Sequence, residues 1–258
     1  MTIDEAISIA GAIAMGALIA VIVKRQIFRQ LPIFLFYLAW GLFGTVLAVA
    51  TMRYFPHIYL NEWIAETCAN TVVYLFALAE LRNKLIRCNR TSPSGWWLLI
   101  FLFVLNGLIL KSLSGWAVPS HFRAEWRFSV HAMQATAILE LAALLTLIEW
   151  AMLRRFRWPD RELRVAFGFG VSAVVEMTYA ILSSHPFLYY GQRYQWASLL
   201  TSTCDLCVLI YWLWYFLLED SKMAEGAAAG AKAAGSARRT GTMARIIRPH
   251  FVQFGRRT

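Results

Sequence analysis

The chain has 258 residues, of which 59% are hydrophobic and only 16% are charged, and its mean hydropathy is +0.52. Soluble domains average about 45–50% apolar and about 25% charged residues, so this composition excludes an ordinary water-soluble globular protein. The formal net charge is +10, but the basic residues lie mainly between apolar blocks, as in membrane proteins. We therefore predict no nucleic-acid partner.

The apolar residues fall into seven blocks of about 20 residues, the length that crosses a hydrocarbon core of about 30 Å as a helix. The blocks are 4–23, 31–53, 62–82, 96–115, 126–152, 163–184 and 196–218. None of them alternates with a period of two, which excludes a transmembrane barrel. The first block has no basic segment before it and no small-residue cleavage site, so we predict a retained helix rather than a signal peptide. The predicted fold is an all-α, polytopic bundle of seven transmembrane helices.

The basic residues predict the orientation of the bundle. Segments 24–30, 82–90 and 154–164 hold 3, 4 and 5 Lys or Arg, and residues 221–258 hold 8, whereas the segments on the other side hold 5 in total. Cytoplasmic segments of membrane proteins carry such an excess. We therefore predict an outside N-terminus, a cytoplasmic C-terminus and a location in the plasma or inner membrane.

The loops on the outer side suggest an internal repeat. "PHIYLNEW" (56–63) and "PSHFRAEW" (119–126) both begin with Pro and end with Glu-Trp, and "HPFLYYGQRYQW" (185–196) ends with Gln-Trp. This pattern would make three helical hairpins that follow the first helix. The alternative is that the loops resemble one another only because Trp is enriched at membrane interfaces and Pro in turns.

The composition changes after residue 220. We predict a membrane domain over 1–220 and a basic, largely disordered cytoplasmic tail over 221–258, whose first half is rich in Ala and Gly. The end of the tail mixes arginines with apolar side chains, and we expect it to bind anionic lipid or a partner protein. The residues expected to make these contacts are Arg245, Arg248, Phe251, Arg256 and Arg257. The alternative is a tail whose charge only enforces the topology.

Ionisable side chains within the apolar blocks are costly in lipid and usually face a bundle interior or a cavity. At helical spacing they form polar stripes on four of the predicted helices. The stripes are Glu66, Asn70 and Tyr74; Arg127, His131 and Gln134; Ser172, Glu176, Tyr179 and Ser183; and Ser198, Thr201 and Asp205. We predict that they line one shared interior that binds a small ligand or ion. The alternative is packing alone, by hydrogen bonds between helices worth about 1 kcal/mol each.

Asp205 lies about 13 Å from the outer interface at 1.5 Å per residue, the depth of His131 and Gln134, so those side chains are its expected partners. No Lys or Arg lies deep in any predicted helix. The carboxyl groups therefore require protons, His131 or a bound ligand. Glu140 is placed about 180° around its helix from His131, and on this argument it need not belong to the same interior.

Cys204 and Cys207 share a helix face at i and i+3. Burial in lipid opposes a reactive thiolate, and a metal site with Asp205 and His131 would lack a diagnostic spacing. We favour packing over redox chemistry or metal binding, and we predict no metal, no cofactor and no enzymatic activity. The residues expected to form the ligand or ion site are Asp205, Glu176, Glu66, His131, Gln134, Asn70 and Thr201.

The sequence leaves three functions open. The first, which we favour, is transport or conduction of a proton, cation or small solute through the polar interior. The second is a receptor or sensor with an outer pocket and the basic tail as its output. The third is an accessory or anchoring subunit of a larger membrane complex. The polar residues lie mostly in the outer half, which fits a pocket better than a continuous path.

Overall fold

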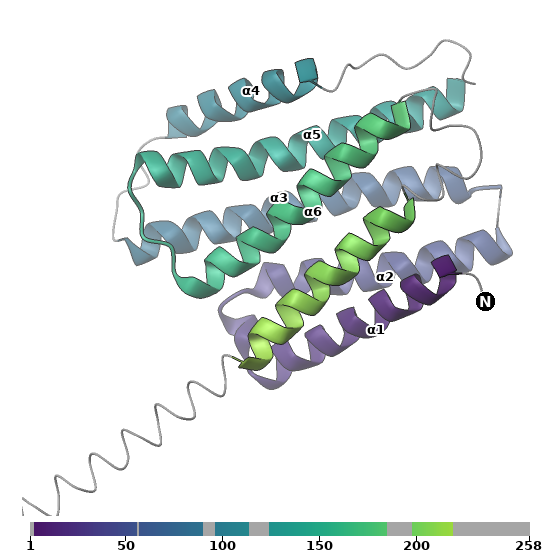
Figure 1. Ribbon diagram of the computed structural model, residues 1–258, viewed down its shortest axis with the longest axis horizontal. Helices are drawn as coiled ribbons and strands as arrows, with labels where there is room; N and C mark the ends of the chain where they lie inside the picture. Colours follow the sequence, from purple (N-terminus) through teal and green to yellow (C-terminus); the bar gives the residue numbers. More distant parts are fainter. Residues whose placement is uncertain (1–2, 56, 90–95, 114–123, 185–197, 219–258) are drawn as a thin grey trace, which may run out of the picture. The chain divides into compact units, whose positions relative to one another are not determined.

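The computed structural model describes residues 3–55, 57–89, 96–113, 124–184 and 198–218 (Figure 1). Its helices are α1 (Ile3–Lys24), the short 3₁₀ helix η1 (Ile27–Arg29), α2 (Pro32–Tyr54), α3 (Tyr59–Cys88), α4 (Trp96–Leu113), α5 (Ala124–Leu153), α6 (Asp160–Ser184) and a last helix, Ser198–Leu218. These ranges contain no strand. Seven of the helices are long and apolar enough to cross a membrane, which confirms the predicted all-helical class and the predicted number of spans.

The helix ends agree closely with the apolar blocks except in α3. The predicted span was 62–82, whereas α3 runs from Tyr59 to Cys88. Hydropathy detects only the apolar part of a helix. The last two turns of α3 carry Arg82, Lys84 and Arg87, which can remain helical beyond the hydrocarbon because they reach water or other polar groups.

The chain divides into two compact units, residues 1–214 and 215–258. This boundary falls inside the helix 198–218, so the division after residue 220 stays a prediction. The tail contacts expected of Arg245, Arg248, Phe251, Arg256 and Arg257 lie outside the described residues, as do most of the outer loops that suggested a hairpin repeat.

Helix α5 lies beside α4 in the first unit (Figure 1). It packs against α3, α4 and α6, while α1 packs on α2 and α2 packs on α3. The helix 198–218 joins this arrangement through Trp212, whose ring centroid is 5.1 Å from that of Phe34 in α2 and 5.4 Å from that of Phe169 in α6. Because α5 has neighbours on several sides, more than one of its faces is buried.

The end of α3, the segment between α1 and α2, and the segment between α5 and α6 with the first turn of α6 meet at one end of the unit, which we call the basic end. Lys84 Nζ lies 3.8 Å from Glu162 Oε1, and Arg161 donates a hydrogen bond to the side-chain oxygen of Gln30. Asn89, which ends α3, donates to the carbonyl of Arg157 at 3.2 Å and accepts from its N–H at 3.0 Å. These contacts gather the predicted cytoplasmic segments in one place.

The helix 198–218 approaches α6 closely at Gly168. A Cβ atom there would collide with the indole of Trp212, which is buried and donates a hydrogen bond to the carbonyl of Arg164 at 3.3 Å. We therefore expect Gly168→Ala to lower the free energy of unfolding by about 1–3 kcal/mol, since the two helices must separate. Reversible unfolding in detergent micelles measures this change.

Gly107 in α4 provides the matched control, because a Cβ atom there meets nothing within 4 Å. Alanine is the better helix former by about 1 kcal/mol, so Gly107→Ala should leave stability unchanged or raise it. Equal effects of the two substitutions would contradict the close contact at Gly168.

Candidate functional site

Three carboxyl groups from three helices lie in the interior of the bundle. Glu140 of α5 is only 3% exposed, and its Oε1 accepts a hydrogen bond from the hydroxyl of Thr71 at 2.7 Å. The carboxyl group of Glu176 in α6 lies within hydrogen-bonding reach of that of Glu140. Asp205, on the helix 198–218, accepts a hydrogen bond from Ser172 of α6 at 3.2 Å. We call Glu140, Glu176 and Asp205 the carboxyl cluster.

The carboxyl cluster has no positively charged partner among the described residues; the ion pair of Lys84 with Glu162 lies apart from it, at the basic end. Removing an ionised carboxylate from water costs several kcal/mol unless a charge or hydrogen bonds compensate it. An ionised carboxylate is only an acceptor, so a hydrogen bond between Glu140 and Glu176 requires a proton between them. The geometry therefore favours a shared proton on this pair.

Tyr37 of α2 lies near all three carboxyl groups of the cluster. Its phenol lies within electrostatic range of Glu176, Glu140 and Asp205. Tyr74 of α3 lies near the first two of these, and its hydroxyl donates to the carbonyl of Phe169 at 3.5 Å. A phenol can both donate and accept a hydrogen bond, so Tyr37 can connect groups that do not touch each other.

An aromatic layer adjoins the carboxyl cluster. It consists of Phe34, Tyr37, Tyr74, Phe169 and Trp212. Its rings meet edge to face, with Tyr74 and Phe169 4.9 Å apart and Tyr37 and Phe169 5.1 Å apart between centroids. Aromatic pairs favour this geometry and contribute about 0.5–1.5 kcal/mol beyond the area they bury.

The aromatic layer lies between the carboxyl cluster and the basic end. On α6, which begins at the basic end, Phe169 precedes Glu176. On the helix 198–218, Trp212 follows Asp205 and contacts the first turns of α6. Four members of the layer are at most 2% exposed. The layer therefore separates the carboxyl groups from the basic end.

The other predicted site residues lie around this centre. The carboxyl group of Glu66 lies against Gly44 of α2 and close to Glu62. Gln134 is fully buried, and neither of its amide atoms has a hydrogen-bond partner among the described residues. His131, Asn70 and Thr201 are half-buried on their helices. The structure thus brings together Glu176 and Asp205 of the predicted set, with Ser172 and Tyr74 of the predicted stripes.

Two expectations about partners differ from the structure. The described hydrogen bond of Asp205 is with Ser172, not with His131 or Gln134. Glu140, which the angle from His131 separated from the shared interior, contacts Glu176 instead. The angle is correct, but α5 is buried on opposite faces, so a residue half a turn away still points into the bundle.

All four cysteines are free thiols. Within the described residues, no group of three or more His, Cys, Asp or Glu side chains is arranged to hold a metal ion.

Comparisons with known protein families, with curated proteins and with solved structures found no match for this chain. Its class is defined by the helices themselves: seven spans of membrane length and apolar composition make it an all-helical, multi-pass membrane protein.

Proposed function

We propose that this chain is a plasma- or inner-membrane protein that binds a proton at its carboxyl cluster and passes it to or from the outer side. The observation that carries the proposal is the close approach of the carboxyl groups of Glu140 and Glu176, beside Asp205 and with no Lys or Arg of the described residues paired to them. Ionisable groups inside membrane helices commonly mark proton or ion pathways.

The neighbouring side chains support a route for the proton. Thr71 and Ser172 hold Glu140 and Asp205 by hydrogen bonds of 2.7 and 3.2 Å, and Tyr37 lies within range of both carboxyl groups. In this arrangement a proton can move between Glu140 and Glu176 directly, and toward Asp205 through hydroxyl groups or water. A small cation could replace the proton at the same carboxyl groups, which we hold as the alternative ligand.

The aromatic layer favours a second candidate function, that of a proton-sensing receptor. The layer closes the side of the carboxyl cluster that faces the basic end, so transport would require it to open, as lids and gates do in other membrane proteins. A receptor would need only a change in helix packing when the cluster gains or loses its proton. The basic-end contacts and tail would then carry the signal.

Proton flux into liposomes separates these functions. We expect the reconstituted protein to acidify a dye-loaded lumen under an imposed pH gradient, and Asp205→Leu to reduce the rate at least tenfold while the bundle stays folded. Asp205→Leu should fold because leucine suits the apolar surroundings and only the Ser172 hydroxyl loses its acceptor.

Asp160→Asn is the matched control, since Asp160 is exposed at the start of α6 and its replacement removes the same charge outside the cluster. Flux equal to that of protein-free liposomes would contradict transport, and proton binding without flux would favour the receptor. Unchanged flux in Asp205→Leu would exclude Asp205 from the pathway.

A further inference from the structure

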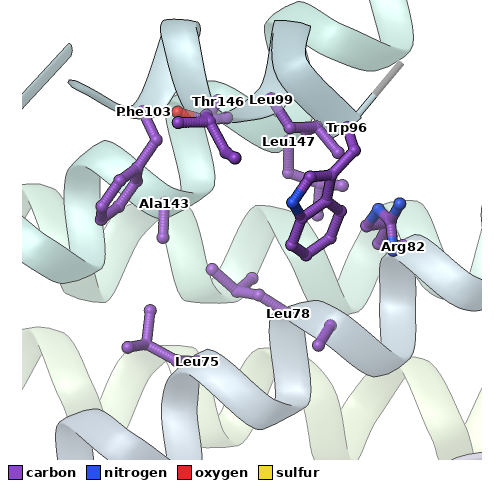
Figure 2. Close-up of a pocket in the computed structure, with 11 residues that line it drawn as sticks. Leu75, Leu78, Arg82, Trp96, Leu99, Phe103, Ala143, Thr146 and Leu147 are labelled. Atoms are coloured by element: carbon purple, nitrogen blue, oxygen red, sulfur yellow. The ribbon is translucent and has the colours of Figure 1, made fainter. Parts of the chain in front are cut away.

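A cavity of about 280 Å³ lies between α3, α4 and α5, away from the carboxyl cluster (Figure 2). It exists because α3 and α4 each pack on α5, while the backbones of α3 and α4 lie apart from each other over their described residues. Its walls are mainly aliphatic and aromatic, and the polar side chains among them are those of Arg82 and Thr146. The cavity is open on one side rather than enclosed, and its apolar lining suits a hydrocarbon ligand.

Arg82 lies at one end of this cavity, and no acidic residue of the described segments forms an ion pair with it. Its guanidinium carbon is 5.2 Å from the centroid of the Trp96 ring and 5.6 Å from that of Trp150. Its Nε is buried without a hydrogen-bond partner in the described part of the chain, where no carboxylate pairs with it. Cation–π contacts attract the charge but leave the N–H donors of the guanidinium unused. The side chain is thus prepared for an anionic acceptor.

The depth of Arg82 matches that of lipid head groups. It lies near the basic end of α3, and it contacts Trp96, the first residue of α4. The next residue, Trp97, is 82% exposed. Tryptophan is enriched at the membrane–water interface, so the two tryptophans place this end of the cavity at the level of the head groups.

From Arg82 the cavity extends into the hydrocarbon region. In Figure 2, Arg82 and Trp96 lie at one end, and Leu75 and Phe103 lie at the other. Leu75 and Arg82 are two turns apart on α3, about 10 Å at 1.5 Å per residue. The volume is just below the range of about 300–1,000 Å³ for sites that enclose a whole small molecule. It therefore suits part of one acyl chain.

We propose that this cavity binds an acyl chain of an anionic phospholipid from the leaflet at the basic end, with the lipid phosphate on Arg82. The guanidinium presents paired N–H donors that match a phosphate group. The surrounding Lys and Arg of the basic end attract the same lipids electrostatically. The site would hold one lipid between α3 and α4, so the lipid completes the packing of these two helices.

Native mass spectrometry of the full-length protein in mild detergent tests the site, with phosphatidylglycerol and phosphatidylcholine as probes. We expect the wild-type chain to retain one phosphatidylglycerol, and Arg82→Gln to weaken its retention about tenfold, as for loss of a charge-assisted hydrogen bond. Ala143→Phe should weaken it too, because Ala143 lines the cavity wall on α5 and a larger side chain fills the space of the acyl chain. Arg87→Gln is the matched control, since Arg87 is exposed on the same helix and outside the cavity lining.

Two further variants keep the test decisive if a substitution disturbs folding. Arg82→Lys preserves the charge without the paired donors and should retain more lipid than Arg82→Gln. Ala143→Leu narrows the cavity with a side chain that is smaller than the phenylalanine of Ala143→Phe. Equal retention of phosphatidylcholine would overturn the preference for an anionic lipid, and unchanged retention in Arg82→Gln would overturn the role of Arg82 in head-group binding. Retention unaffected by the Ala143 variants would overturn acyl-chain binding. Thermal stabilisation of the protein by inorganic phosphate alone, lost in Arg82→Gln, would assign a simple anion site in place of a lipid site.

Discussion

Replacing Glu80 with alanine is expected to lower the free energy of unfolding by about 2–4 kcal/mol, because the start of α2 loses its hydrogen-bond acceptor. Leu31 occupies the N-cap position of α2 and supplies no side-chain hydrogen bond, and Pro32 follows it. Glu80 Oε2, from α3, accepts the N–H groups of Ile33 and Phe34, both at 3.1 Å. The first free donors of α2 are thus satisfied from a different helix.

Two substitutions define this prediction further. Glu80→Gln retains an acceptor oxygen without the charge and should cost less than Glu80→Ala. Asn83→Ala changes an exposed residue of the same helix and should stay within about 0.5 kcal/mol of the wild-type protein. Unfolding in detergent micelles, followed by circular dichroism, measures all three. If Glu80→Ala is no more destabilising than Asn83→Ala, the cap contributes nothing.

The second large effect is expected at Glu140 and Glu176, whose substitutions should be strongly non-additive. Glu140→Leu deprives both Thr71 and Glu176 of a partner, and breaking a buried polar pair from one side costs about 3–5 kcal/mol. Glu176→Leu has the same consequence for Glu140. The double leucine variant removes both buried carboxyl groups, and replacing both partners by apolar groups is often nearly neutral.

We therefore expect the double variant to be more stable than the sum of the single effects predicts, by about 1–3 kcal/mol. A double-mutant cycle on the free energy of unfolding measures this coupling. Glu140→Gln should fold normally, because glutamine offers an oxygen to Thr71 and an N–H to Glu176. Additive single effects would mean that the two carboxyl groups do not interact.

The helices could be predicted from the sequence because their signal is local. Each span is a run of apolar residues, and only the polar extension of α3 to Cys88 was missed. The capping of α2 by Glu80 could not be predicted, since the interacting residues are 46 and 47 positions apart and nothing near Leu31 indicates where the acceptor comes from. It depends on how α2 and α3 pack.

The candidate site was predictable in part, because the periodicity of polar residues along a helix is also a local signal. Periodicity placed Ser172, Glu176 and Asp205 on polar stripes, and these stripes do meet. Periodicity reports which residues share a face of one helix, but it cannot show how many faces of that helix are buried. The angle from His131 therefore left the place of Glu140 open, and Tyr37, in a run of apolar and aromatic residues, carried no signal.

Infrared difference spectroscopy tests the proton on the carboxyl cluster most directly. The C=O stretch of a protonated carboxyl group is separate from the bands of ionised carboxylates and shifts when the solvent is changed to D2O. We expect this band in the wild-type protein at neutral pH, unchanged in Asp160→Asn and weaker in the double variant Glu140→Gln/Glu176→Gln, in which Asp205 can still contribute. A wild-type protein without the band, or a double variant with a band of undiminished intensity, would contradict a proton shared by Glu140 and Glu176.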